Sequence, residues 1–214
     1  MTINQKRRQK ALLKKRRKDK ERRKKQTRFS DSSEYSNMVR LIKNAKSYPL
    51  HECLIDKEWQ DRGLAQILLS RRQPNKKLIF GVYLVDIYCL GLKNTYCHAN
   101  FSLEEYQDLK HKAFKETILI PNPPGKVCNI IFGAIEYARR LGFKPQKDFD
   151  LSQFVLEGLP IDNYDLTSEF GYEGKPLFIA GPDDDFNTII KTLKKNVGED
   201  NFDFIAPIPL GGHR

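Results

Sequence analysis

Long hydrophobic runs are missing from this chain of 214 residues. The longest apolar stretch, LIFGVYLVDIYCLGL at residues 78–92, is interrupted by Asp86 and is rich in β-branched and aromatic residues. A membrane helix needs about 20 consecutive apolar residues, so the sequence predicts no membrane span. Near the start, the basic residues are interrupted by only three consecutive apolar residues, Ala11, Leu12 and Leu13, and we expect no secretory signal because its apolar core is missing.

Cysteine is also scarce. The four cysteines (Cys53, Cys89, Cys97 and Cys128) lack the dense spacing of a secreted disulfide framework, which predicts a reducing cytoplasm, or a nuclear or nucleolar location in a eukaryote. The glycines form neither a Walker motif nor a dinucleotide-binding fingerprint. The sequence therefore argues against nucleotide-dependent chemistry, and no cofactor is predicted.

Positive charge is concentrated at one end of the chain. Residues 1–28 contain 15 Lys and Arg against two acidic residues, a formal charge of +13, whereas the whole chain carries +11 and residues 29–214 therefore sum to −2. Like charges with almost no apolar surface to bury predict an arm that is disordered alone and folds or extends on a polyanion. The arm residues predicted to bind nucleic acid are Lys6, Arg7, Arg8, Lys10, Lys14, Lys15, Arg16, Arg17, Lys18, Lys20, Arg22, Arg23, Lys24, Lys25 and Arg28.

The arm has no aromatic residue before Phe29, which favours contacts with the phosphate backbone over base stacking. Arginine-rich segments that fold on RNA are a familiar case, so RNA is favoured modestly over DNA. The alternatives are a solubilising tail, an arm that binds acidic lipid, or a nuclear address. An amphipathic membrane helix would need large apolar side chains along one side, and only Leu12 and Leu13 are available.

Periodicity and turn residues predict an α+β fold: one domain over residues 30–214 with a mixed sheet that contains a β-hairpin, packed helices, and a basic arm over residues 1–29. Residues 71–77 (RRQPNKK) form the predicted hairpin turn, and its Arg71, Arg72, Lys76 and Lys77 are predicted to add phosphate contacts. Strands are expected at residues 51–55, 64–70, 78–90 and 202–208, and residues 168–180 are expected to form a strand or a hairpin that turns at Glu173-Gly174. Helices are expected at 34–46, 102–115, 126–141, 151–156 and 186–196, and a loop at 91–101.

Asp86 lies inside an apolar strand, where a carboxylate is costly unless it is paired, hydrogen-bonded or bound to a metal. One hypothesis is a structural carboxylate that pins a loop or a helix N-terminus. The other joins Asp86 to Asp183, Asp184 and Asp185 as ligands of Mg²⁺ for phosphodiester cleavage, with Lys93 stabilising charge. Acids before a helix also serve as its N-terminal cap, which is the simpler interpretation of the 183–185 loop.

Histidine and cysteine offer two further alternatives. Cys97 is a candidate nucleophile with His98 or His51 as its base, because loops at strand ends often carry catalytic groups. The residues His51, Cys53, Cys97 and His98 form a candidate zinc set, but adjacent Cys97 and His98 point apart on an extended chain and the Cys-x₂-Cys spacing is missing.

Four stretches, HECLIDKEW, RRQPNKKLIFGVYLVDIYCLGLKN, AIEYARRLGFKPQKDF and FGYEGKPLFIAGPDDD, resemble a group of bacterial proteins of uncharacterised function that join a basic N-terminal tail to an α+β domain. The resemblance implies a bacterial origin and neither a named activity nor catalytic residues.

These features together predict a cytoplasmic RNA-binding protein, associated with a ribonucleoprotein such as the ribosome. The first alternative is a metal-dependent nuclease or phosphodiesterase built on Asp86 and the 183–185 loop. The second is a protein-binding adaptor that its tail merely localises.

Overall fold

The computed structural model describes residues 33–160 and 170–206. The chain forms two compact units, residues 1–40 and 41–214. Residues 33–40 of the first unit are helical, and in the second unit the helical residues 41–43 precede the 3-10 turn Ala45–Ser47. The basic arm and the predicted domain boundary at residue 29 lie outside the described residues.

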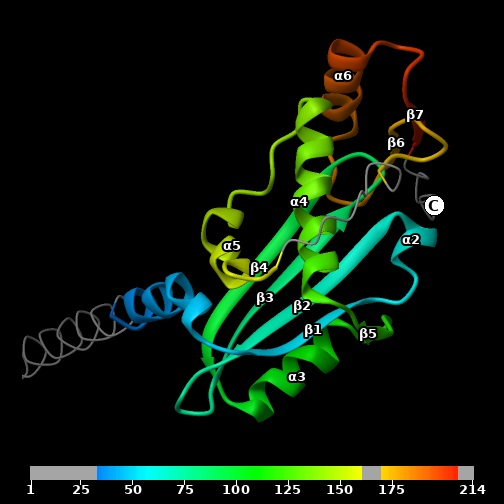
Figure 1. The fold of residues 1–214 in the computed structure, drawn as a ribbon. Coiled ribbons are helices and arrows are strands. Elements are labelled where there is room, and N and C mark those ends of the chain that lie inside the picture. Colours follow the sequence, from blue (N-terminus) through cyan, green and yellow to red (C-terminus); the bar gives the residue numbers. More distant parts are fainter. Residues whose placement is uncertain (1–32, 161–169, 207–214) are drawn as a thin grey trace, which may run out of the picture. The chain divides into compact units, whose positions relative to one another are not determined.

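An antiparallel sheet of five strands forms the centre of the second unit (Figure 1). Its strands are β1 (Leu50–Asp56), β2 (Leu64–Arg72), β3 (Leu78–Asp86), β4 (Gly91–Phe101) and β5 (Leu119–Pro121), in the spatial order β4-β3-β2-β1-β5. The predicted hairpin is confirmed, because β2 and β3 pair without interruption from Leu64 opposite Asp86 to Arg72 opposite Leu78. The predicted α+β class is confirmed as well.

Helices cover both faces of this sheet. The helices α4 (Pro124–Arg140) and α5 (Phe149–Leu156) pack on one face, where the Tyr83 hydroxyl of β3 donates to the Ser152 carbonyl oxygen of α5 at 2.8 Å. The helix α3 (Leu103–Ala113) packs on the other, with Tyr106 in one buried cluster with Phe80 of β3 and Leu68 of β2. Strand side chains alternate between faces, so β3 with its near-continuous apolar sequence serves both layers.

Residues at the N-termini of two expected helices explain where these helices begin. Ser102 and Glu105 form a capping box at the start of α3, with each side chain accepting from the other residue's backbone N–H. The helix α4 begins at Pro124, two residues before the expected start, because proline fits the first turn of a helix, where no N–H partner is needed.

The loop predicted at residues 91–101 is wrong: these residues form β4, the outer strand beside β3. The strand β3 correspondingly ends at Asp86, four residues earlier than predicted. The pairing of β3 with β4 is irregular at two places, between Leu84 and Val85 and between Leu78 and Phe80. A bulge inserts one extra residue into a strand, so the period of two that would reveal β4 in the sequence is broken twice.

Smaller elements surround the end of the sheet where β3 turns into β4. They are α2 (Trp59–Arg62), β6 (Leu177–Ile179), α6 (Phe186–Val197) and β7 (Asp203–Ile205), and the parallel pair β6-β7 forms a separate two-stranded sheet. A second buried cluster, including Cys89, Phe178 and Leu193, joins the β3–β4 turn to β6 and α6. The elements α2 and β5 were not predicted, since both are only three or four residues long.

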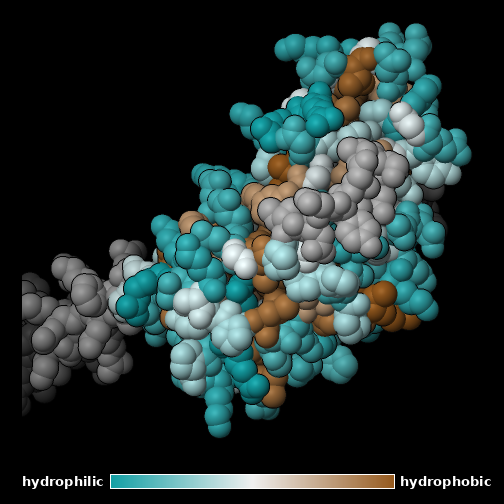
Figure 2. Space-filling view, viewed as in Figure 1, coloured by the Kyte–Doolittle hydropathy of each residue, from teal (hydrophilic) through white to brown (hydrophobic). Residues whose placement is uncertain are grey.

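The face shown in Figure 2 is largely hydrophilic, and hydrophobic residues emerge on it in separate small groups. Among the described residues, no helix combines the length and the apolar character that a membrane crossing requires.

Candidate functional site

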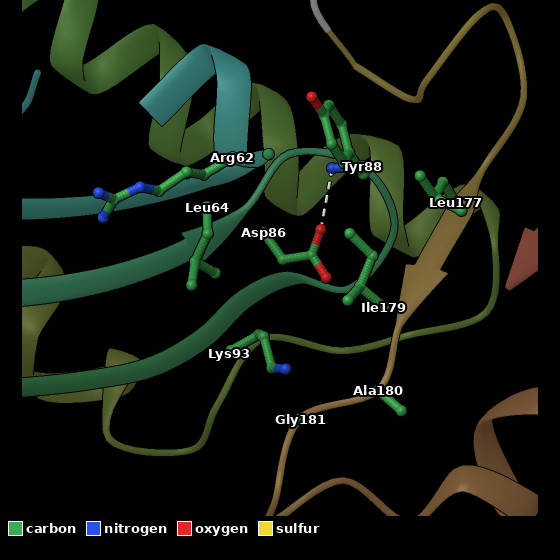
Figure 3. Close-up of a pocket in the computed structure, with 10 residues that line it drawn as sticks. Arg62, Leu64, Asp86, Tyr88, Lys93, Leu177, Ile179, Ala180 and Gly181 are labelled. Carbon is green, nitrogen blue, oxygen red and sulfur yellow. Dashed lines mark hydrogen bonds between the residues drawn. The ribbon is translucent and has the colours of Figure 1, made fainter. Parts of the chain in front are cut away.

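A pocket of about 170 Å³ lies at the end of the β3–β4 hairpin and is lined by two residues of the predicted nuclease site (Figure 3). Asp86 and Lys93 line it from β3 and β4, and Gly181 lines it from the loop before α6. The remaining wall consists of Arg62, Gly63, Leu64, Tyr88, Leu177, Ile179 and Ala180. Residues almost a hundred positions apart in the sequence thus line one pocket.

Asp86 closes the turn between β3 and β4. Its Oδ1 accepts hydrogen bonds from the backbone N–H groups of Tyr88 and Cys89, both at 2.9 Å. The side chain is buried, and this burial raises the pKa of the Asp86 carboxyl above its ordinary value, although the N–H groups and the charge of Lys93 act in the opposite direction. Its contacts are those of a carboxylate that pins a turn, as the structural hypothesis expects.

Lys93 is placed at the pocket by one of the two irregularities of β4. Leu84 pairs with Asn94 and Val85 pairs with Leu92, so Lys93 is the extra residue between two paired positions. Bulges of this kind redirect a side chain. The Lys93 ammonium donates to Asp184 Oδ2 at 2.7 Å, and the same oxygen accepts from the Gly181 backbone N–H at 2.8 Å. Both charged side chains are mostly buried.

The other two acids of the loop differ in their surroundings. Asp185 is the N-cap of α6, where it accepts from the backbone N–H and the hydroxyl of Thr188. Asp183 is exposed. Over residues 33–160 and 170–206, no group of three or more His, Cys, Asp or Glu side chains is arranged to hold a metal ion. Asp184 was a predicted Mg²⁺ ligand, but in the structure its carboxylate pairs with the Lys93 ammonium, which neutralises its charge.

The pocket combines apolar walls with one buried charge pair. Its volume is below the range of about 300–1,000 Å³ that is typical of small-molecule sites. Glycine is required at one wall position: Gly63 has a φ of +66°, and a Cβ there would lie 2.0 Å from the Tyr88 ring. Sequence reasoning missed this contact, and the only sequence signal is a glycine at the end of α2, where it forms the left-handed C-cap. The contacts around the pocket therefore fit a structural role, in which they stabilise the surrounding turns, better than they fit the binding of a small molecule.

The cysteine and histidine candidates do not meet. Gly81 pairs with Cys97 and Phe80 with His98, so the two neighbours on β4 lie on opposite faces of the sheet. Burial, and to a smaller degree Asp148, raises the pKa of Cys97 to about 11, which keeps the thiol protonated and weakly nucleophilic at neutral pH. His98 has its Nδ1 2.7 Å from the Ala99 carbonyl oxygen.

The candidate zinc set is separated in the same way. The pairing of β1 with β2 shifts between Leu50 and Glu52, so His51 is an extra residue, and its ring lies 6.2 Å from that of Tyr106 in α3. Cys53 pairs with Leu69 and is buried. Sequence spacing alone put His51 and Cys53 on one face; the strand irregularity at His51 removes that alignment.

The basic hairpin tip divides into one buried and three exposed residues. Arg71 is 3% exposed, and its guanidinium donates to the carbonyl oxygens of Val155 (2.8 Å), Tyr48 (3.0 Å) and Glu157 (2.6 Å). It therefore caps the C-terminal end of α5 and does not face solvent, where a phosphate would bind. Arg72, Lys76 and Lys77 are exposed, as a phosphate contact requires.

Comparisons of the chain with protein-family models, with curated proteins and with solved structures gave no match.

Proposed function

We propose that the protein binds nucleic acid, with RNA as the preferred partner, through its basic N-terminal arm. The observation that carries the proposal is the separation of charge: +13 within residues 1–28 and −2 over the other residues. Neutralising phosphates with Lys and Arg releases counterions, which supplies affinity without reading the base sequence. A ribonucleoprotein such as the ribosome would supply these phosphates.

Three residues of the folded unit form a second, smaller group of positive charges. Arg72, Lys76 and Lys77 are exposed at the turn between β2 and β3. Asn75 Oδ1 accepts from the Lys77 backbone N–H at 3.0 Å, and the Lys76 N–H donates to the Gln73 carbonyl oxygen, so the turn itself is ordered. An ordered turn presents its cations to a phosphate backbone at a lower entropic cost than a free chain would.

The nuclease alternative receives less support from the geometry. Metal-assisted cleavage needs carboxylate oxygens that are free to bind the ion. Asp86 Oδ1 and Asp184 Oδ2 each accept two hydrogen bonds from the protein, and Asp185 caps α6. A nuclease built on these three residues would need to break a turn, an ion pair and a helix cap in order to bind its metal.

A paired binding and cleavage assay tests the proposal. The full chain and a chain without residues 1–28 are each incubated with labelled structured RNA and with duplex DNA, with and without Mg²⁺, over a series of salt concentrations. We expect the full chain to bind, to lose affinity steeply as salt rises, and to leave the nucleic acid intact; the shortened chain should lose most of the affinity. A circular dichroism spectrum of the shortened chain controls for folding.

Two outcomes contradict the proposal. Mg²⁺-dependent cleavage that persists without residues 1–28 and disappears in Asp86→Asn would make the folded unit an enzyme. Binding to neither nucleic acid at low salt would leave the adaptor alternative, in which the arm only localises the chain.

A further inference from the structure

Aromatic side chains lie side by side on one face of β4. Tyr96, His98 and Phe101 form a row, with ring centroids 6.3 Å apart for the first pair and 4.7 Å apart for the second. The Phe80 ring of β3 contacts all three, at 5.7, 6.5 and 5.0 Å respectively. Phe80 is fully buried whereas Tyr96 is 48% exposed, so a buried ring supports an aromatic surface that reaches solvent.

The second irregularity of β4 builds this row. Positions 98 and 101 would fall on opposite faces of a regular strand, because side chains alternate. Phe80 pairs with His98, but Leu78, two residues earlier, pairs with Phe101, three residues later. The extra residue in this stretch, where Asn100 has a φ of +67°, returns Phe101 to the face of His98. A strained backbone position of this kind costs free energy and often marks a functional surface.

The ring of His98 is also held in one orientation. Its Nδ1 lies 2.7 Å from the Ala99 carbonyl oxygen, and a carbonyl oxygen only accepts, so Nδ1 carries the proton of this hydrogen bond. Held rings lose little conformational freedom when a flat partner stacks on them.

Positive charge borders the same face. Phe101 pairs with Leu78, the residue that directly follows Lys77, so the aromatic row ends beside the hairpin tip with its exposed Arg72, Lys76 and Lys77. Glu105, an acidic residue near this face, accepts a hydrogen bond in the capping box of α3. The hydrogen bonds of Ser102 lower the pKa of Glu105 most, and the charges of Lys77 and His98 lower it further. Lys77 and His98 therefore both lie close enough to Glu105 to affect its charge.

We propose that Tyr96, His98 and Phe101 form a stacking platform for the unpaired bases of single-stranded RNA, whose phosphates are bound by Arg72, Lys76 and Lys77. This rests on the proposed nucleic-acid binding and specifies its partner: the arm supplies sequence-independent affinity, and the platform selects single strands over duplexes. Bases in a duplex are stacked on one another and offer no free face, whereas the bases of a single strand stack on protein aromatics.

The test measures affinity of the full chain for a labelled oligouridine of about 12 nucleotides and for a duplex RNA. Replacing Tyr96 by Ala removes an exposed ring, and Tyr172→Ala is the matched control because Tyr172 is 47% exposed and lies outside the platform. We expect Tyr96→Ala to weaken oligouridine binding by about tenfold and to leave duplex binding unchanged. Tyr96→Phe, which keeps the ring, and Tyr172→Ala should bind oligouridine as the parent chain does.

The salt dependence separates stacking from charge. Tyr96→Ala should lower the affinity at every salt concentration without changing the slope of log Kobs against log salt, whereas Lys77→Ala should make the slope shallower.

If the parent chain binds neither RNA, the proposed function fails together with the platform. If the parent chain binds RNA and Tyr96→Ala binds both RNAs with the affinity of the parent chain, the proposed platform is wrong and the proposed function stands. Dissociation of a dimer by Tyr96→Ala, with RNA affinity unchanged, would show that a second copy covers the face and would also overturn the platform.

Discussion

Asp86 is a buried carboxylate whose burial raises its pKa, and this has a consequence for stability. A pKa that is higher in the folded than in the unfolded chain means that the folded state binds the proton more tightly. The contribution of Asp86 to stability is therefore greatest below its ordinary pKa of 3.8 and is lost as the pH rises through the raised value. At neutral pH the charged group costs stability.

The raised pKa of Asp86 predicts how the substitution Asp86→Asn changes stability at different pH values. The amide oxygen can still accept from Tyr88 and Cys89, so we expect the variant to be as stable as the parent, or more stable, at pH 7 and to lose that advantage towards pH 4. Urea unfolding of both chains between pH 4 and 8 measures the difference. A variant that is clearly less stable at pH 7 would show that the negative charge itself stabilises the turn.

Arg71 and Arg72 are neighbours with opposite roles. Arg71→Ala leaves three carbonyl oxygens without their donor inside the protein, and we expect it to lower the free energy of unfolding by at least about 2 kcal/mol. Arg72→Ala, at an exposed position, should change it by no more than about 0.5 kcal/mol. Denaturant unfolding measures both, and equal effects would contradict the assignment of Arg71 to the end of α5.

At the scale of the element, the acidic loop before α6 distinguishes a helix cap from a metal site. Asp185 caps α6 through Thr188, so Asp185→Ala should lower the midpoint of thermal unfolding. Asp183→Ala should leave the midpoint where it is, since Asp183 is exposed. Addition of Mg²⁺ should shift neither variant nor the parent. A midpoint that rises with Mg²⁺ in the parent and not in Asp183→Ala would instead indicate a metal ligand at that position.

The helices and the central hairpin could be predicted because their signals are local. Ser102 and Glu105 define the start of α3, and the Pro-Asn turn separates two apolar strands. The strand β4 could not be predicted, because two bulges interrupt its alternation and polar residues such as Lys93 and Asn94 resemble a loop. The β-propensity of individual residues depends strongly on their surroundings, and β4 depends on pairing with β3 for its conformation.

The sequence offered Asp86, Lys93 and the 183–185 loop as members of one hypothetical site, but it did not give their contacts. In the structure Lys93 pairs with Asp184 and lines the same pocket as Asp86, whereas Asp185 caps α6 and Asp183 is exposed. The partner of Arg71 was not predictable, since its carbonyl acceptors in Val155 and Glu157 are more than 80 residues away and backbone acceptors leave no mark on the sequence.

At the scale of the whole molecule, charge and fold are separated along the chain. A nearly neutral sequence builds the sheet and its helices, and the net positive charge lies entirely within residues 1–28. This arrangement predicts that affinity for nucleic acid depends on the arm and that stability does not. Neutralising the arm by replacing its Lys and Arg with Gln should therefore leave the unfolding midpoint of the folded unit unchanged, as measured by circular dichroism. A large fall in the midpoint would mean that the arm also supports the fold.

The salt dependence of RNA binding by the full chain shows whether RNA binds through the basic arm. Each phosphate contact with single-stranded RNA contributes about −0.7 to the slope of log Kobs against log salt, so an arm that makes seven or more of its contacts predicts a slope of roughly −5 or steeper. The same chain with its arm Lys and Arg replaced by Gln should show a slope no steeper than about −2, which the contacts of Arg72, Lys76 and Lys77 can supply. A shallow slope in the parent chain, or an equal slope in both chains, would contradict binding through the basic arm.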